Sequence, residues 1–92
     1  AGGTGAELFL RHGCGACHRI DGTEAQGSVG PDLSHVGSRA AIGAGILPNS
    51  EEAIARFIAD PDKVKPGVLM PAFDMLPPEE IAAIAAYLRA LQ

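Results

Sequence analysis

The last part of the chain carries apolar residues at the spacing of an amphipathic helix. These apolar positions are Ile81, Ile84, Ala85, Leu88 and Leu91. Pro78 suits the first turn of a helix, and the neighbouring acidic pair Glu79 and Glu80 suits its positive end. The pattern therefore predicts a helix over residues 78–91.

Two shorter segments show the same kind of pattern. Residues 4–12 place Leu8 and Phe9 on one side and are followed by Gly13, a typical helix stop. Residues 50–59 carry an apolar stripe behind a capping position at Asn49 or Ser50. The stripe consists of Ala53, Ile54, Phe57 and Ile58. Asp60-Pro61 ends this helix, because proline disfavours helical geometry in the residue before it.

The segments between these helices are rich in glycine and proline, notably 27–31, 40–48 and 61–77. No alternating or β-branched run is available to build a sheet. The sequence predicts one mostly α-helical domain over residues 1–92, in which short helices and long loops surround a bound group that fills the centre. Its 92 residues contain no Trp and only 4% aromatic residues, so something other than side chains must fill the centre.

The motif Cys14-Gly15-Ala16-Cys17-His18 indicates which group could fill the centre. Two thiols at this spacing can add to the two vinyl groups of one haem. The residue after the second cysteine is then held beneath the iron as an axial ligand. The motif predicts haem c attached covalently through Cys14 and Cys17, with His18 as an iron ligand.

Three other readings of the two cysteines remain. A redox-active dithiol uses the same spacing but belongs on a βαβ unit, for which this sequence has no strands. A structural zinc site needs four ligands, so two of His12, His18 and His35 would have to join the cysteines in an unusual pattern. A disulfide across so short a loop would stabilise little.

With these motifs in view, the chain resembles the class I cytochrome c family over essentially its whole length. The resemblance rests on the order of the first helix, the cysteine motif, Gly30-Pro31-Asp32-Leu33, a Met70-Pro71 loop and Tyr87-Leu88 in the last helix. One departure is that Gly5 and Phe9 lie one residue further from Cys14 than is usual. Gly13 is expected to absorb this extra residue in a turn.

The resemblance implies a set of site residues. Met70 would be the second iron ligand, and the carbonyl of Pro31 would accept the other ring N–H of His18. Arg39 would lie near a haem propionate, and a solvated loop arginine is the alternative. Residues expected to pack on the haem are Leu33, Phe57, Val68, Leu69 and Phe73. Met75 and an open sixth position are the alternatives to Met70, and Met75 is expected to pack beneath the start of the last helix.

A narrower resemblance is carried by residues 30–39, 42–50 and 60–61. They are similar to the cytochrome c domain fused to subunit II of some haem-copper oxygen reductases. This resemblance implies single-electron transfer from a donor complex or soluble carrier to the copper centre of the oxidase, with no enzyme activity of the domain alone. The alternatives are a free periplasmic monohaem cytochrome and, with a labile sixth ligand, a haem sensor or peroxidase.

Charge and hydropathy limit the other partners. The formal net charge is −4, and no Lys/Arg cluster is present to neutralise nucleic-acid phosphates. No apolar run is long enough to cross a bilayer, so a membrane association is expected only through a fused subunit. The lack of a signal peptide suggests a mature or excised domain, with residues 1–4 as a linker or processed terminus. Because haem attachment in the resembled family occurs outside the bacterial cytoplasm, we expect a periplasmic or outer-face location.

Four other residues are expected to have no part in the chemistry. His12 and His35 are expected at the surface or in hydrogen bonds. Lys63 and Lys65 lie beside acidic residues, which is typical of a solvated face rather than of a docking rim.

Overall fold

The computed structural model describes residues 4–39, 41–42 and 47–91. Four α-helices lie in this part of the chain. They are α1 (Gly5–Arg11), α2 (Glu51–Ala59), α3 (Pro61–Val64) and α4 (Pro78–Arg89). Two short 3₁₀ turns, η1 (Cys14–Ala16) and η2 (Val36–Ser38), and two strands of two residues each, β1 (Ala41–Ile42) and β2 (Leu47–Pro48), complete the described elements.

The three helices expected from the sequence are present, each one or more residues shorter than predicted. Thr4 caps α1 in a reciprocal arrangement with Glu7, which satisfies backbone donors at the helix start. The hydroxyl of Ser50, rather than Asn49, caps α2 by accepting a hydrogen bond from the amide of Ala53 at 3.1 Å. Gly13 adopts a left-handed conformation with φ of 81°, so it ends the first helix and turns the chain toward Cys14.

Two segments that were expected to be loops contain short regular elements. Pro61 ends α2 and also begins α3, because its fixed φ suits the first position of a helix while it disfavours helical geometry in Asp60. The strands β1 and β2 pair in antiparallel register, with Ala41 opposite Pro48 and Ile42 opposite Leu47. The sequence offered no run from which these four residues could be predicted as strands. They are too few to show an alternating pattern.

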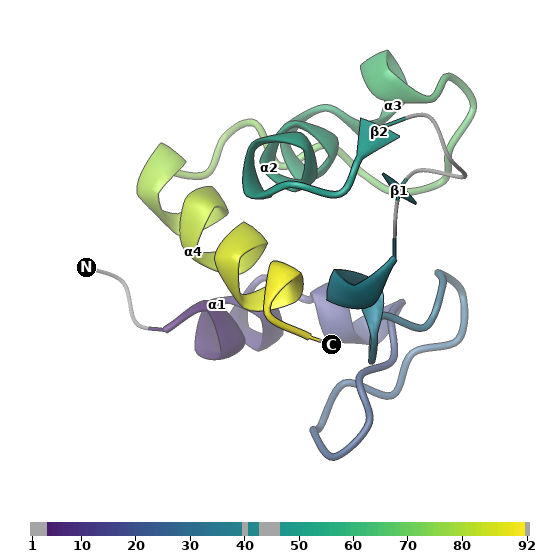
Figure 1. Cartoon of the computed structure of the whole chain (residues 1–92), viewed down its shortest axis with the longest axis vertical. Coiled ribbons are helices and arrows are strands. Elements are labelled where there is room, and N and C mark those ends of the chain that lie inside the picture. Colours follow the sequence, from purple (N-terminus) through teal and green to yellow (C-terminus); the bar gives the residue numbers. More distant parts are fainter. Residues whose placement is uncertain (1–3, 40, 43–46, 92) are drawn as a thin grey trace.

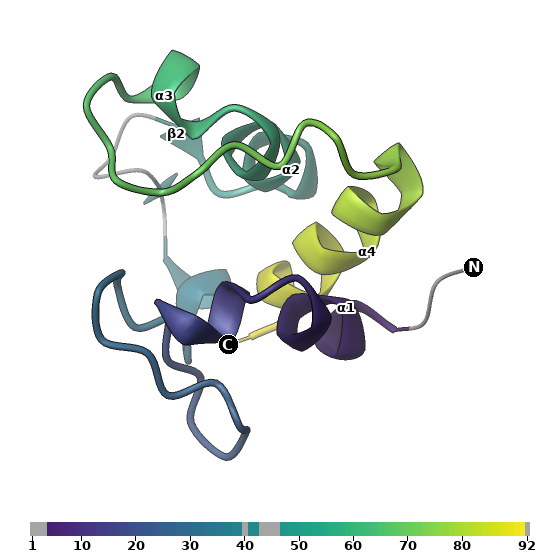
Figure 2. The same cartoon turned by 180° about the vertical axis from the view of Figure 1, so that it is seen from behind.

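Helix α4 joins the two parts of the molecule. It packs against α1 and η2 on one side and against α2 on the other. In Figures 1 and 2 residues 4–39 lie below and residues 47–76 lie above, with α4 crossing between them. The buried core lies along this helix and is formed mainly by Leu8, Phe9, Ile20, Val36, Ile54, Ile58, Ile81, Ile84, Ala85 and Leu88.

Helices α1 and α4 approach each other closely where they cross at Gly5. A Cβ atom at Gly5 would overlap the carbonyl oxygen of Ala83 and lie 2.6 Å from the Cβ of Tyr87. The rings of Phe9 and Tyr87 meet edge to face, with their centroids 6.2 Å apart. This contact fixes the end of α1, and hence the position of the cysteine segment that follows it.

Candidate functional site

The cysteine motif is wound into a single turn directly after α1. The amide of Cys17 donates to the carbonyl of Cys14 at 3.2 Å, and the amide of His18 donates to the same carbonyl at 3.0 Å. Cys14 is half-buried against the core, whereas Cys17 is exposed. Burial is the main cause that raises the pKa of the Cys14 thiol. The turn therefore presents two thiols and one imidazole from a segment of five residues.

The imidazole of His18 is held by the next loop. Its Nδ1 lies 2.8 Å from the carbonyl oxygen of Pro31, which can only accept, so Nδ1 carries the proton. A Cβ at Gly30 would lie 2.5 Å from the ring. Glycine at this position lets the backbone lie against the ring face, and the ring is thereby fixed in one orientation with Nε2 as its remaining nitrogen.

The Pro31 loop is tied to the cysteine segment by the backbone. Gly30 donates to the carbonyl of Cys17 at 2.7 Å, and Leu33 donates to the carbonyl of Arg19 at 2.8 Å. The hydroxyl of Ser34 accepts a hydrogen bond from the amide of Asp21 at 2.8 Å. These bonds bring residues 14–21 and 30–34, which are separated in sequence, into one unit.

The two methionines lie in different surroundings. Met70 is half-buried and packs against the core, whereas the side chain of Met75 is 71% exposed. The expectation that Met75 packs beneath the start of α4 is therefore wrong. Between them, the amide of Phe73 donates to the carbonyl of Ile58 at 3.2 Å, which anchors the segment to α2. Met75 lies beyond this anchor, on the side of α4.

The residues expected to pack on the haem differ in exposure. Leu33 and Phe73 are half-buried against the core, and Phe57 and Val68 are also half-buried. Leu69 is 88% exposed. Their contact with a haem stays a prediction.

Arg39 is exposed, and its guanidinium donates to the carbonyl of Asp32 at 2.7 Å. The structure thus shows a backbone partner for Arg39, while its role toward a haem propionate stays a prediction. Asp32 itself accepts a hydrogen bond from the amide of Ser34 at 2.8 Å. Hydrogen bonding to Ser34 is the main cause that lowers the pKa of the Asp32 carboxyl.

His12, His35 and Lys63 lie where the sequence led us to expect them, whereas Lys65 is half-buried. His12 Nε2 lies 2.9 Å from a carboxylate oxygen of Glu80, joining the end of α1 to the start of α4. His35 is exposed. Lys63 forms a loose pair with Asp60 at 4.0 Å, and its side chain is 82% exposed. In the described ranges no three His, Cys, Asp or Glu side chains are grouped as a metal site, so the structure does not assemble a zinc ligand set there.

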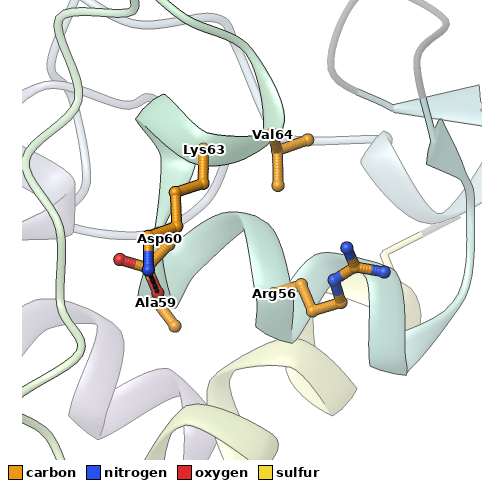
Figure 3. Close-up of a pocket in the computed structure, with 5 residues that line it drawn as sticks. All are labelled: Arg56, Ala59, Asp60, Lys63 and Val64. Atoms are coloured by element: carbon orange, nitrogen blue, oxygen red, sulfur yellow. Dashed lines mark ion pairs between the residues drawn. The ribbon is translucent and has the colours of Figure 1, made fainter.

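A cavity of about 150 Å³ lies where α2 meets α3, away from the cysteine motif in sequence. Its lining is Arg56, Ala59, Asp60, Lys63 and Val64. Figure 3 shows Lys63 beside Asp60, with the guanidinium of Arg56 directed away from them. The side chains are therefore not convergent, and nothing in this cavity suggests a catalytic site.

Asn49 has a structural role that the sequence did not reveal. Its Nδ2 donates to the carbonyls of Val36 at 2.8 Å and Arg39 at 2.7 Å. Its Oδ1 is buried and has no hydrogen-bond partner among the described residues. The sequence suggested only a helix cap here, because a hydrogen bond to a distant carbonyl leaves no local pattern.

Comparison with known proteins identifies the family. The model of the cytochrome c family matches residues 3–92. The chain belongs to the cytochrome c family. As a member it carries covalently bound haem c, for which Cys14 and Cys17 are the two cysteines of the chain, and it functions in haem-based electron transfer.

Several relatives belong to oxidases. Cytochrome c oxidase subunit 2 of Alkalihalophilus pseudofirmus is 36% identical over 88 residues, which are 96% of this chain and 25% of the relative. The same subunit of Bacillus sp. strain PS3 is 38% identical over 90 residues, which are 94% of this chain and 25% of the relative. The chain thus spans about a quarter of the length of these relatives.

Other relatives match over most of their own length. Cytochrome c2 iso-2 of Magnetospirillum fulvum is 33% identical over 89 residues, covering 85% of this chain and 91% of the relative. The crystal structure of the c-type cytochrome SorU from Sinorhizobium meliloti superposes with a TM-score of 0.65 at 28% identity, covering 95% of this chain and 85% of that one. The predicted fold class is confirmed by this neighbour and by the family.

The residues present fit the cofactor. The cysteine turn offers both thiols together, and the Pro31 carbonyl and Gly30 fix the imidazole with one nitrogen left for iron. No helix of the described ranges is long and apolar enough to cross a membrane.

Proposed function

We propose that His18 and Met70 are the axial ligands of the haem iron and that the domain delivers electrons to the copper centre of a respiratory oxidase. The observation that carries the first part is the hydrogen bond between His18 Nδ1 and the Pro31 carbonyl at 2.8 Å. It leaves Nε2 unprotonated, which is the form of imidazole that binds a metal.

The protein groups set the properties of the carrier. The Pro31 carbonyl draws on the ring proton of His18, which makes the imidazole a stronger donor and favours ferric iron. A thioether ligand favours ferrous iron, so a His/Met pair gives a potential at which the domain both accepts and donates. Bound haem would supply one-electron chemistry between ferric and ferrous iron. With both axial positions held by side chains, no substrate can bind to the iron.

Packing favours Met70 over Met75 as the thioether ligand. Met70 is half-buried in the loop before the Phe73 anchor, whereas Met75 is exposed after it. Moving Met75 to the position of Met70 would require release of the hydrogen bond between Phe73 and Ile58. Met70 needs no such rearrangement of the anchor.

The acceptor is inferred from the relatives. The two oxidase relatives described above are named cytochrome c oxidase subunit 2, and this chain covers 25% of each. We infer that this domain follows a copper-binding part in a longer subunit and lies on the periplasmic or outer face of the membrane. A free periplasmic carrier is the second candidate, because cytochrome c2 iso-2 is covered over 91% of its length.

Rapid mixing tests the acceptor. The ferrous holoprotein is mixed with the oxidised copper-binding fragment of the same subunit, and haem oxidation is followed by absorbance. Prompt oxidation by that fragment, slower with an unrelated copper protein of similar potential, supports the oxidase role. Equal rates with both acceptors would favour the free carrier. The gene sequence upstream of Ala1 gives an independent answer, since a copper-site motif supports the oxidase and a signal peptide alone does not.

A further inference from the structure

The end of α4 is fastened to η2 by a pair of hydrogen bonds that run in opposite directions. Arg89 donates from Nη1 to the carbonyl of Gly37 at 2.8 Å. The amide of Gly37 donates to the carbonyl of Leu91 at 2.6 Å. A Cβ at Gly37 would overlap the carbonyl oxygen of Arg89, so only glycine lets the two backbones approach this closely.

The same turn is fixed from a second side. Asn49 bridges the carbonyls of Val36 and Arg39, which flank Gly37. Because both acceptors are carbonyls, the amide of Asn49 has one possible orientation. The turn η2 is thus held between the end of α4 and the start of α2, and its position is well defined.

Two contacts connect η2 to His18, one through Arg39 and one through Pro31. Arg39 follows the turn directly, and its guanidinium binds the carbonyl of Asp32. Asp32 is bonded in sequence to Pro31, whose carbonyl accepts the His18 ring proton. Pro31 and Asp32 are both exposed, so packing alone does not fix this carbonyl.

We propose that Arg89 is a positioning residue for the axial histidine, acting through Gly37 and Arg39 on the Pro31 carbonyl. This inference rests on the proposed ligation of iron by His18. The backbone bond from Leu33 to Arg19 holds the loop on the side of the cysteine motif. The bond from Gly30 to Cys17 holds the other end of the loop on the same motif. Arg39, positioned by Arg89 through η2, binds the Asp32 carbonyl between these two bonds, and the Pro31 carbonyl stays on the imidazole only when this third contact is kept.

Loss of Arg89 has two opposing effects on the reduction potential. A weaker hydrogen bond to Pro31 makes His18 a poorer donor and raises the potential. Removal of a positive charge favours ferric iron and lowers the potential. A variant that removes an arginine elsewhere separates the effect of the lost charge from the effect of the weakened hydrogen bond. Arg56 on α2 is a suitable control, because it is exposed and takes no part in the hydrogen bonds that hold η2 or the Pro31 loop.

The experiment compares Arg89→Ala with Arg56→Ala in the holoprotein. Exchange of the His18 Nδ1–H with solvent is measured by NMR in the diamagnetic ferrous state, and the midpoint potential is measured for each variant. We expect exchange about tenfold faster in Arg89→Ala, the change that corresponds to one lost hydrogen bond to a charged group. Exchange in Arg56→Ala should equal that of the wild type, and the potential of Arg89→Ala should be the higher of the two variants.

Equal exchange in Arg89→Ala and the wild type would overturn the inference. So would a matching acceleration of the α1 backbone amides, which would mean that the whole helix pair has loosened. Arg39→Ala provides the second variant. It should speed the same ring proton, and the double variant should be no faster than the faster single one. Ring resonances of His18 that lack an iron-bound signature in the wild type would refute the ligation itself, which is a separate failure.

Discussion

The close crossing of α1 and α4 makes Gly5→Ala a severe test of the fold that carries the haem site. Alanine is the better helix former by at most about 1 kcal/mol, and less at the first position of a helix. Its Cβ, however, would overlap the carbonyl oxygen of Ala83 and lie 2.6 Å from the Cβ of Tyr87, where real Cβ contacts are essentially never shorter than 3.0 Å. Both obstacles belong to the body of α4, so a change of rotamer cannot relieve them.

The helices must therefore move apart, which weakens packing around Leu8 and Phe9. Overpacking of this kind costs about 1–3 kcal/mol, and the gain in helix propensity offsets only a part of it. We expect a net loss of about 1–2 kcal/mol, which corresponds to a Tm lower by about 5–15 °C for a domain of this size.

Equilibrium unfolding of the holoprotein in guanidinium chloride, followed by circular dichroism, measures this loss. Gly22→Ala is the control, because Gly22 has φ of 80° but no atom within 4 Å of a Cβ placed there. It should cost stability through local strain alone and leave hydrogen exchange in α1 unchanged. If Gly5→Ala proved as stable as the wild type, the two helices would not cross at this residue.

Four further outcomes follow from the site and its surroundings. Met70→Ala should lower the reduction potential and open the iron to exogenous ligands, whereas Met75→Ala should keep the absorption band of the thioether–iron bond in the ferric state. The reverse result would make Met75 the ligand instead of Met70. The Cys14→Ala/Cys17→Ala apoprotein should show little helix by circular dichroism, because the haem takes the place of core side chains that this small domain lacks. A helix content equal to that of the holoprotein would contradict this. Electron transfer from the donor should depend only weakly on salt if, as we propose, docking uses an apolar edge that includes the exposed Leu69. A steep loss of rate with added salt, reversed in Glu51→Lys/Glu52→Lys, would refute this. The carboxyl of Asp32 has a lowered pKa, so its carboxylate stabilises the fold above the ordinary aspartate pKa, and this contribution disappears as the pH falls. The unfolding midpoint of Asp32→Asn should therefore decline less in acid than that of the wild type. Parallel curves of unfolding midpoint against pH for the two proteins would contradict this.

The sequence was most informative where local patterns decide the structure. Helices α1, α2 and α4 follow from apolar spacing, capping residues and prolines, and Gly13 turns the chain as the extra residue before Cys14 required. The hydrogen bond between His18 and Pro31 followed from family resemblance rather than from the residues themselves.

Features that depend on distant contacts were not predictable. Helix α3 is one turn long, and the pair of β1 and β2 spans four residues, so neither has a measurable period. Met75 is exposed and follows the hydrogen bond that anchors Phe73 to Ile58, and no local pattern marks that anchor. The bridges made by Asn49 and Arg89 to η2 connect residues 10 to 52 positions apart.

Visible absorption of the purified holoprotein in both oxidation states, with and without carbon monoxide, tests the central claim most directly. If His18 and Met70 both bind the iron, the ferric and ferrous spectra will each be those of six-coordinate low-spin haem, and carbon monoxide will leave the ferrous spectrum unchanged. A high-spin ferric spectrum, or prompt binding of carbon monoxide, would show an open sixth position. Such a result would contradict the carrier and favour a sensor or a peroxidase.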